Sequence, residues 1–431
     1  MPIIALLIYI VLTFCPIIYK YLPFLGTIKT VLIAGIVLLI SFLLTYTNYA
    51  NSTAYKHTVI PCWAVILVVM TLGLLVSVDR GLTLELVQSS LKVFLIFLVM
   101  IKIVDSVKRL QIILLAFVLS GIGMAGSTLF NYFVNPDSLR TAEAANLSGG
   151  YRAIALESGV FGDPNDLALL FNTVLPFAIY LLLINKQKVV PLLGISILVI
   201  AIVLTHSRAG FLGLCVTALG FLMIFRKSHG KHILVICVLA ASLFVVAPDS
   251  YKERIGTLYS SEEGQTIEEG RINGWLIAIK EGMSHPVLGV GAGGSMYVNL
   301  ETAKDWHAVH NTFAQVFVEM GAFGFAAYLM LFITSLRQSQ KKNEGSSEQV
   351  KSFSKSLAVA FVTYGTTAFF TPQAYSSLLF ILTALTVITS ELMKKEYVPV
   401  SSPRTPGVLR TAGVNTRELL VHQKMPIDPS R

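Results

Sequence analysis

Charged residues are scarce in this sequence. Only 13% of the 431 residues are Asp, Glu, Lys or Arg, 54% are hydrophobic, and the mean hydropathy is +0.71. A soluble chain carries about 25% charged residues, because charge must cover its surface. The composition therefore excludes a cytosolic enzyme, a secreted disulfide scaffold and a disordered chain. It predicts a protein that faces lipid over most of its surface.

Cysteines and basic clusters are also sparse. The four cysteines lie in apolar runs and form no C-x-x-C pair, so we interpret them as small apolar side chains in helices. The formal net charge is +9, yet no Lys- or Arg-rich block is interleaved with aromatic residues, so nucleic acid is not an expected partner. No Lys or Arg precedes Lys20, which disfavours a signal peptide and favours a retained first span.

Long apolar runs fill the sequence instead. A bilayer core about 30 Å thick requires roughly 20 apolar helical residues to cross it. The runs predict an all-α, polytopic integral membrane protein of about 12 transmembrane helices with one large periplasmic loop. The expected spans are 2–19, 25–46, 58–78, 86–104, 110–130, 165–184, 189–205, 209–226, 232–248, 311–334, 355–371 and 375–393.

The loops between these runs differ in positive charge. If the N-terminus is inside, the inward short loops hold fourteen Lys and Arg and the outward ones six, which favours cytoplasmic termini. The expected parts are spans one to nine (1–248, with an outside loop at 135–164), a large outside loop (249–310), spans ten to twelve (311–393) and a flexible cytoplasmic tail (394–431).

The large outside loop is the only sizeable polar region, and long loops on a rigid scaffold tend to carry function. Trp275, Ala278 and Ile279 are spaced as one face of a short amphipathic helix, which would fit a helix lying along the membrane surface. Pro286 ends this helix, and glycines follow at 289, 291, 293 and 294.

Several basic residues gather on the outer side, although Lys and Arg are in general more frequent in the inward loops. Arg208 lies in a very short turn between two apolar runs, Arg271 opens the amphipathic helix, and Arg152 lies in the first outside loop. Lys92 lies inside the fourth span. Guanidinium groups suit bidentate phosphate contacts, so an anionic ligand is one interpretation. Interface anchoring is the alternative for Arg208, and extension to the headgroups is the alternative for Lys92.

His310 and Asn311 lie where the large loop re-enters the membrane. A helix is expected to start there, and the unpaired N–H groups of a helix start attract anions. His310 could act as a general base, or it could simply cap the helix. His307 could form a metal pair with His310, but no third ligand is evident, so no metal is expected.

Two further polar groups stand at helix boundaries or inside a span. Asp163, Pro164 and Asn165 form a turn and helix-start signal, so they either cap the helix or contact a ligand. Glu319 lies about two turns into the tenth span, where an acid requires a partner or a function.

Taken in order, these segments resemble the O-antigen ligase and O-antigen polymerase superfamily of bacterial polytopic membrane glycosyltransferases. The resemblance covers about 155–325 by motif. The matching pieces are Gly162-Asp163-Pro164-Asn165, Ser207-Arg208-Ala209-Gly210, Gly270-Arg271 with Trp275, Pro286 with Gly289 and Gly291, and His310-Asn311 with Glu319 and Gly321.

The resemblance implies a reaction and a location. Family members transfer a glycan from undecaprenyl diphosphate to an acceptor at the periplasmic face of the bacterial inner membrane, and the ligase type uses lipid A–core and needs no metal or other cofactor. The family's functional residues carry over to Arg208 and Arg271 as diphosphate ligands and to His310 as the group that serves the acceptor hydroxyl. Arg152, Asp163, Asn165, Asn311, Glu319 and Lys92 are candidates for supporting roles.

Other functions stay open from the sequence. Within the superfamily, a polymerase of O-antigen or exopolysaccharide repeat units and a protein O-oligosaccharyltransferase share the same features. A polysaccharide transporter or flippase would predict repeats between the two halves and polar groups at the membrane midplane. The polar groups gather at the outer face instead, which favours an enzyme over a transporter or a scaffolding protein.

Overall fold

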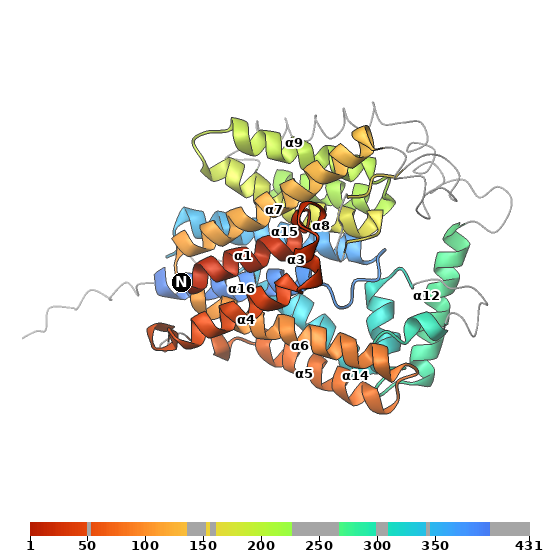
Figure 1. Cartoon of the computed structure of the whole chain (residues 1–431). Coiled ribbons are helices and arrows are strands. Elements are labelled where there is room, and N and C mark those ends of the chain that lie inside the picture. The colour runs from red at the N-terminus through yellow and green to blue at the C-terminus, as the bar shows by residue number, and fades with distance from the viewer. Residues whose placement is uncertain are drawn as a thin grey trace, which may run out of the picture. The chain divides into compact units, whose positions relative to one another are not determined.

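A computed structural model describes residues 1–49, 53–135, 152–155, 161–225, 267–298, 309–341 and 345–396, and it describes the backbone alone for 267–271. All these residues belong to one compact unit, Met1–Tyr397. Every regular element in the described ranges is a helix (Figure 1), which confirms the all-α prediction. Most of the expected loop 135–164, the run 232–248 and the tail beyond Glu396 lie outside the described residues.

The elements have the following bounds. They are α1 (Pro2–Phe14), α2 (Ile18–Tyr21), α3 (Phe24–Thr27), α4 (Thr30–Leu43), η1 (Tyr46–Tyr49), η2 (Ala54–Lys56), α5 (Val59–Leu72), η3 (Gly73–Leu75), α6 (Arg80–Ile103), α7 (Val107–Val134), α8 (Pro164–Ile184), α9 (Val189–Leu204), the helix Arg208–Phe225, α12 (Ile267–Ser284), α14 (Thr312–Ser339), α15 (Glu348–Ala368) and α16 (Ser377–Glu396).

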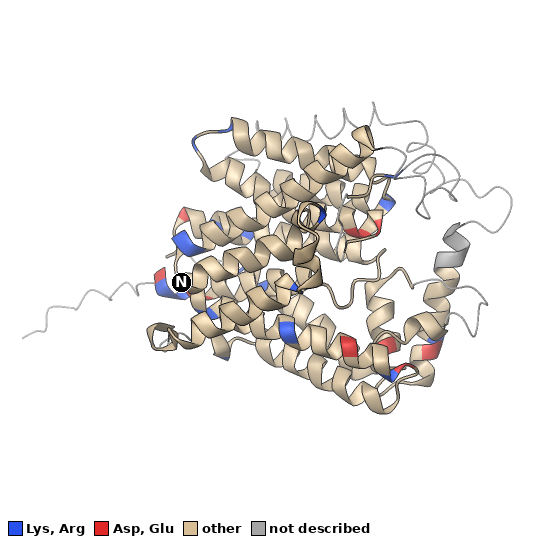
Figure 2. Ribbon diagram, in the orientation of Figure 1, with Lys and Arg blue, Asp and Glu red and all other residues tan. Residues whose placement is uncertain are grey.

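Six of the described helices are long and apolar enough to cross a membrane: α6, α7, α8, Arg208–Phe225, α14 and α16. The apolar helices α1, α4 and α9, and α5 together with η3, are shorter. Eleven of the twelve expected runs fall on described helices, so the multi-pass character is confirmed, and the count of twelve crossings stays a prediction. In Figure 2 most Lys, Arg, Asp and Glu lie near helix ends, as a bilayer requires.

The first two runs are interrupted rather than continuous. α1 ends at Phe14, just before Cys15 and Pro16, because proline cannot continue the hydrogen-bond ladder. Within the second run, Lys29 has a left-handed backbone (φ 52°) that separates α3 from α4. Apolar periodicity does not register such breaks, so the expected boundaries 2–19 and 25–46 are too long.

Helix α8 forms the centre of the core. Its most apolar stretch is 94% buried, because α7, α9 and α15 pack around it. Gly121 of α7 lets Val174 of α8 approach closely: a Cβ at Gly121 would lie 2.8 Å from the Val174 methyls. A helix that is apolar all round is stable only when neighbours surround it in this way.

Helix α12 packs against α14 and runs across the direction of α5 and α6 (Figure 1). Ala278 is buried, and Trp275 lies with its ring centre 5.3 Å from that of Phe369. Ile279 is 44% exposed, so the apolar face expected from Trp275, Ala278 and Ile279 is divided between packing against neighbouring helices and an exposed surface. Ile279 instead continues an exposed apolar stripe with Ile272 and Met283, beside the packed face.

Candidate functional site

The start of α8 is fixed by its own sequence. Asp163 is the N-cap, and its carboxylate accepts a 2.6 Å hydrogen bond from the backbone N–H of Asn165. Pro164 occupies the first turn, where its missing N–H costs nothing. The turn and helix-start prediction for these residues is confirmed, and the exposed Asp163 carboxylate stands at a helix N-terminus.

Arg152 ties a separate segment to this start. Its side chain is only 6% exposed, and Nε donates to the Thr205 carbonyl at 2.9 Å while Nη2 donates to Oδ1 of Asn165 at 3.0 Å. A buried guanidinium requires such partners. Arg152 therefore joins the start of α8 to the turn that follows α9.

That turn contains Arg208. Ser207 Oγ accepts the N–H of Gly210 at 3.1 Å and thereby starts the helix Arg208–Phe225. The side chains of His206 and Ser207 are buried, and Arg208 is half-buried. His206 has a left-handed backbone (φ 51°), which is rare outside glycine and clusters at functional sites.

The same helix packs closely on α8. Asn172 of α8 donates to the Gly210 carbonyl at 3.0 Å, and a Cβ at Gly210 would lie 2.8 Å from the Cβ of Ala168. Arg208 therefore begins its helix close to the first turns of α8.

His310 stands at the start of α14. Asn311 is the N-cap, and its Oδ1 accepts the N–H groups of Phe313 at 2.9 Å and Ala314 at 3.0 Å. The expected helix start at His310-Asn311 is thus confirmed, with Asn311 in the capping role. His310 is half-buried and has a left-handed backbone (φ 46°), like His206.

Gln373 joins the starts of α8 and α14. Its side-chain amide donates to Asp166 at 2.7 Å, and its backbone N–H donates to Oγ1 of Thr312 at 3.0 Å. Thr312 in turn donates to the Thr371 carbonyl at 2.6 Å. The three helix starts that carry Asn165, Arg208 and His310 are therefore held at one end of the bundle.

Glu319 is fully buried in α14 and has three side-chain partners. It accepts from Ser295 at 2.5 Å, from Gln315 at 3.3 Å and from the Tyr375 hydroxyl. Ser295 follows the glycines after α12, and Tyr375 lies in the segment before α16. Glu319 thus holds the segment with glycines at 289, 291, 293 and 294 (the glycine segment) against the helices. These contacts indicate a structural role for Glu319 rather than contact with a ligand.

The glycine segment also contacts α6. The Ala292 carbonyl accepts from Thr83 at 2.7 Å, and Tyr297 donates to the Asp79 carboxylate at 2.6 Å. The Tyr297 hydroxyl and the N–H of Leu82 hold the pKa of Asp79 below its usual value, and the same hydrogen bond raises the pKa of Tyr297.

The structure therefore brings together most of the residues expected from the sequence: Arg152, Asp163, Asn165, Arg208, His310, Asn311 and, deeper in α14, Glu319. The backbone of Arg271 lies in α12, and its side chain is outside the described residues. Lys92 stands apart, about three turns into α6, and is exposed.

Sequence reasoning missed two members of this end of the bundle, His206 and Gln373. His206 lies in the same Thr205–Gly210 turn as Arg208. Its position near this candidate arginine could have identified it from the sequence. The link between Asp166 and Gln373 spans 207 positions in the chain, and no local pattern indicates it.

These features define a polytopic membrane protein with basic and imidazole side chains at several helix starts on one end. Residues 193–329 match the family model described as O-antigen ligase, a range that includes Arg208, α12, the glycine segment, His310 and Glu319. The match supports assignment of the chain to the O-antigen ligase and polymerase superfamily and a function of that general type, with lipid-linked glycans and glycan acceptors as partners. No curated protein matches the chain.

Proposed function

We propose that this protein is an O-antigen ligase-like glycosyltransferase, which transfers a glycan from undecaprenyl diphosphate to lipid A–core at the periplasmic face of the bacterial inner membrane, without a metal. The observation that carries the proposal is the hydrogen-bonded junction of three helix starts, at which Arg152, Arg208 and His310 stand. The proposed location of the site on the periplasmic side of the membrane rests on the uneven distribution of Lys and Arg among the loops.

Arg208 and Arg271 are the proposed ligands of the diphosphate. The leaving group is a lipid diphosphate, so negative charge develops on phosphate oxygens as the glycosidic bond breaks. Guanidinium groups held in place by helices stabilise this charge strongly where little water is present, and they can take the part that a metal plays elsewhere. Helix N-termini add N–H donors to the same anion.

Arg152 has a different part in this proposal. Its guanidinium is occupied by the Thr205 carbonyl and the Asn165 side chain, so it positions the Arg208 turn against α8. Its positive charge still contributes to the local field that favours an anionic ligand.

His310 is the proposed group that receives the proton of the acceptor hydroxyl. A neutral imidazole can act as a general base near neutral pH. Asn311 caps α14 immediately after it and so fixes the backbone from which the imidazole projects. The left-handed backbone at His310 is an outlier of the kind that accompanies functional constraint. Attack opposite the departing diphosphate would invert the anomeric centre.

The decisive experiment uses purified protein in nanodiscs with a glycan on undecaprenyl diphosphate, lipid A–core and EDTA. A single mass shift of lipid A–core, lost in His310→Ala and reduced in Arg208→Lys, is the expected result. The lysine variant is expected to fail because an ammonium cannot form the bidentate fork. His285→Ala and Arg337→Lys alter exposed residues away from the junction and serve as matched controls.

Other outcomes separate the alternatives. A ladder on the lipid-linked glycan would make the protein a polymerase, and transfer to a serine or threonine of an added protein would make it a protein O-oligosaccharyltransferase. Movement of the lipid-linked glycan across the membrane without any covalent transfer would assign it to the transporters. Full transfer by His310→Ala would remove this residue from the chemistry.

A further inference from the structure

The end of the bundle opposite the junction of helix starts carries a basic cluster. α16 starts four residues after Gln373, in that junction, and ends at Glu396, about 30 Å away along a helix of 20 residues. The end of α16 meets η2 and the turn between α6 and α7 there. Figure 2 shows several Lys and Arg segments around this end, near the N-terminus of the chain. The basic cluster consists of Lys56, Lys102, Lys108, Arg109, Lys394 and Lys395.

The acidic side chains at this place already have partners. Asp105 accepts from Nη1 of Arg109 at 2.9 Å, and Glu391 accepts from Nζ of Lys394 at 2.6 Å. Glu396 is directed to α15, where it accepts from the backbone N–H of the N-cap residue at 2.8 Å. Six cations against these three acids leave a net charge of +3 where the elements meet. This positive charge is not balanced within the cluster, so it attracts an anion.

Two tyrosines hold cations of the cluster in place. Nζ of Lys102 lies 4.2 Å from the centre of the Tyr55 ring and 3.5 Å from the Tyr49 carbonyl oxygen. The guanidinium carbon of Arg109 lies 5.7 Å from the centre of the Tyr49 ring. Contacts between a cation and a ring face are attractive and orient both side chains. Tyrosines are also enriched at the level of lipid headgroups, so this pairing places the basic cluster at that level.

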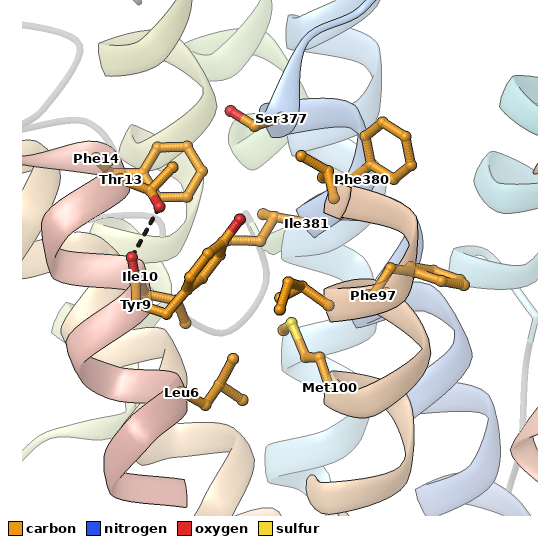
Figure 3. Close-up of a pocket in the computed structure, with 13 residues that line it drawn as sticks. Leu6, Tyr9, Ile10, Thr13, Phe14, Phe97, Met100, Ser377, Phe380 and Ile381 are labelled. Atoms are coloured by element: carbon orange, nitrogen blue, oxygen red, sulfur yellow. Dashed lines mark hydrogen bonds between the residues drawn. The ribbon is translucent and has the colours of Figure 1, made fainter. Parts of the chain in front are cut away.

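Apolar surface lies next to the tyrosines, on the outside of α4. Leu43 and Leu44 are exposed at the end of this helix, and the ring of Phe42 lies 6.0 Å from that of Tyr49. The cavity between α1, α6 and α16 (Figure 3) has a volume of about 30 Å³, which holds a few water molecules at most. An acyl chain is too large for this cavity, so a lipid at the cluster lies along the outer surface of α4.

We propose that the basic cluster binds the headgroup of an anionic phospholipid of the phosphatidylglycerol type. The phosphodiester meets Lys56, Lys108 and Lys395, which are exposed and come from three different elements. Clusters of Lys and Arg beside membrane-spanning helices attract anionic headgroups in this way. A lipid fits better than a free anion, because the cations and the exposed apolar end of α4 lie side by side. The site is at the other end of the bundle from Arg208 and His310, so the inference is independent of the proposed function.

The experiment is native mass spectrometry of the full chain in detergent, titrated with phosphatidylglycerol or with phosphatidylcholine of the same acyl chains. The expected result is about tenfold tighter binding of phosphatidylglycerol, since phosphatidylcholine has no net charge. Lys108→Gln combined with Lys395→Gln should remove this preference and leave the affinity for phosphatidylcholine unchanged. Both side chains are exposed, so the substitutions remove charge without opening the core. Equal affinity of the unsubstituted protein for the two lipids would overturn the proposal.

The matched control is Lys186→Gln combined with Arg337→Gln. These exposed cations lie just after α8 and near the end of α14, two helices that also start at the junction, so the same charge is lost at the same end of the bundle. The control should keep the preference for phosphatidylglycerol. An equal loss in both pairs would mean a diffuse attraction without a site and would overturn the proposal. Displacement of the lipid by millimolar inorganic phosphate would overturn it as well, because the site would then bind a free anion.

A charge-conserving pair covers the case in which the glutamine pair folds poorly. Lys108→Arg combined with Lys395→Arg keeps both positive charges and should keep the preference for phosphatidylglycerol. Loss of the preference in this arginine pair would contradict an electrostatic headgroup site.

Discussion

Ser295 donates a 2.5 Å hydrogen bond to Glu319, and this bond joins the glycine segment after α12 to the interior of α14. The acceptor lies inside a membrane-spanning helix, two turns beyond the start at which His310 stands. The bond also explains why an acid is tolerated there, because Glu319 is surrounded by hydroxyl and amide donors rather than by lipid. The carboxylate of Glu319 thus links a loop to the membrane-embedded core through hydrogen bonds.

Replacing Glu319 with alanine is expected to destabilise this junction. The Ser295 and Tyr375 hydroxyls and the Gln315 amide would lose their acceptor, and each buried donor left unsatisfied costs about 1–3 kcal/mol. The thermal unfolding midpoint in detergent should fall in Glu319→Ala. It should fall less in Glu319→Gln, which keeps the side-chain shape and one acceptor oxygen. Glu348→Ala is the control, since its side chain is 84% exposed. Equal thermal unfolding midpoints for all three variants would contradict the role of Glu319 in linking the loop to α14.

Gly321→Ala is expected to disrupt the same region by a different mechanism. Gly321 has φ 62° and ψ −166° inside α14, and a Cβ there would lie 2.6 Å from the Val287 carbonyl carbon and 2.7 Å from the Pro286 oxygen. The strained conformation alone costs about 1–3 kcal/mol for a residue with a side chain. Thermal unfolding of the purified protein measures the effect.

The matched control for that substitution is Gly126→Ala. Gly126 lies in α7 with nothing within 4 Å of its Cβ position, so alanine there should leave stability unchanged or raise it by up to about 1 kcal/mol. If the two alanine variants unfold alike, the kink at Gly321 is not needed for the packing of α12 on α14.

Much of the helical layout was predictable because the apolar runs match the length of a bilayer crossing. For example, the apolar run at 165–184 predicts a span there, and α8 extends over Pro164–Ile184. What the runs do not contain is local backbone geometry. The break between α3 and α4 depends on a left-handed Lys29, and the kink in α14 depends on a left-handed Gly321. Neither feature changes the hydropathy of the run, so the hydropathy pattern predicts neither break.

The candidate site was predictable residue by residue but not as an arrangement. The helix-start signals at Asp163 and Asn311 are local, and both residues cap helices as expected. The contacts that hold these helix starts together are long-range. The Arg152 bonds to Thr205 and Asn165 and the Gln373 bond to Asp166 arise from packing, which a single sequence does not encode in any short pattern.

The exposed stripe of α12 predicts contact with the membrane interface. Ile272, Ile279 and Met283 are 52%, 44% and 69% exposed, and the stripe continues into Val287, itself 57% exposed. Amphipathic helices of this kind lie in the membrane interface with the apolar stripe in lipid. The fluorescence of the tryptophan introduced by Ile279→Trp should be quenched by brominated phosphatidylcholine. The quenching is measured as the difference between this variant and the unsubstituted protein.

Asn273→Trp is the comparison for that measurement, because Asn273 is exposed on the polar side of the same helix. It should be quenched much less. Equal quenching at the two positions would mean that α12 has no preferred side toward lipid, and the surface orientation of the helix would have to be abandoned.

His57 predicts how stability depends on pH. Burial lowers the pKa of His57 from 6.5 to about 4, and the positive charge of Lys394 adds to this effect while Glu391 opposes it. The folded protein therefore keeps His57 neutral, whereas the unfolded chain binds a proton near pH 6.5. The resulting stability is present above pH 6.5 and is lost as the pH falls toward 4, by a total of about 3 kcal/mol.

Unfolding midpoints measured between pH 4 and pH 7.5 test this dependence. His57→Asn keeps a side-chain acceptor for the N–H of Val59, which donates to Nδ1 of His57 at 3.3 Å, and it removes the titrating group. The variant should lose most of the decline between pH 6.5 and pH 4. His285→Asn should retain the decline, because His285 is exposed at the end of α12 and its removal leaves His57 in place. A decline that persists unchanged in His57→Asn would assign the acid sensitivity to other groups, and the burial of His57 would then have no consequence for stability.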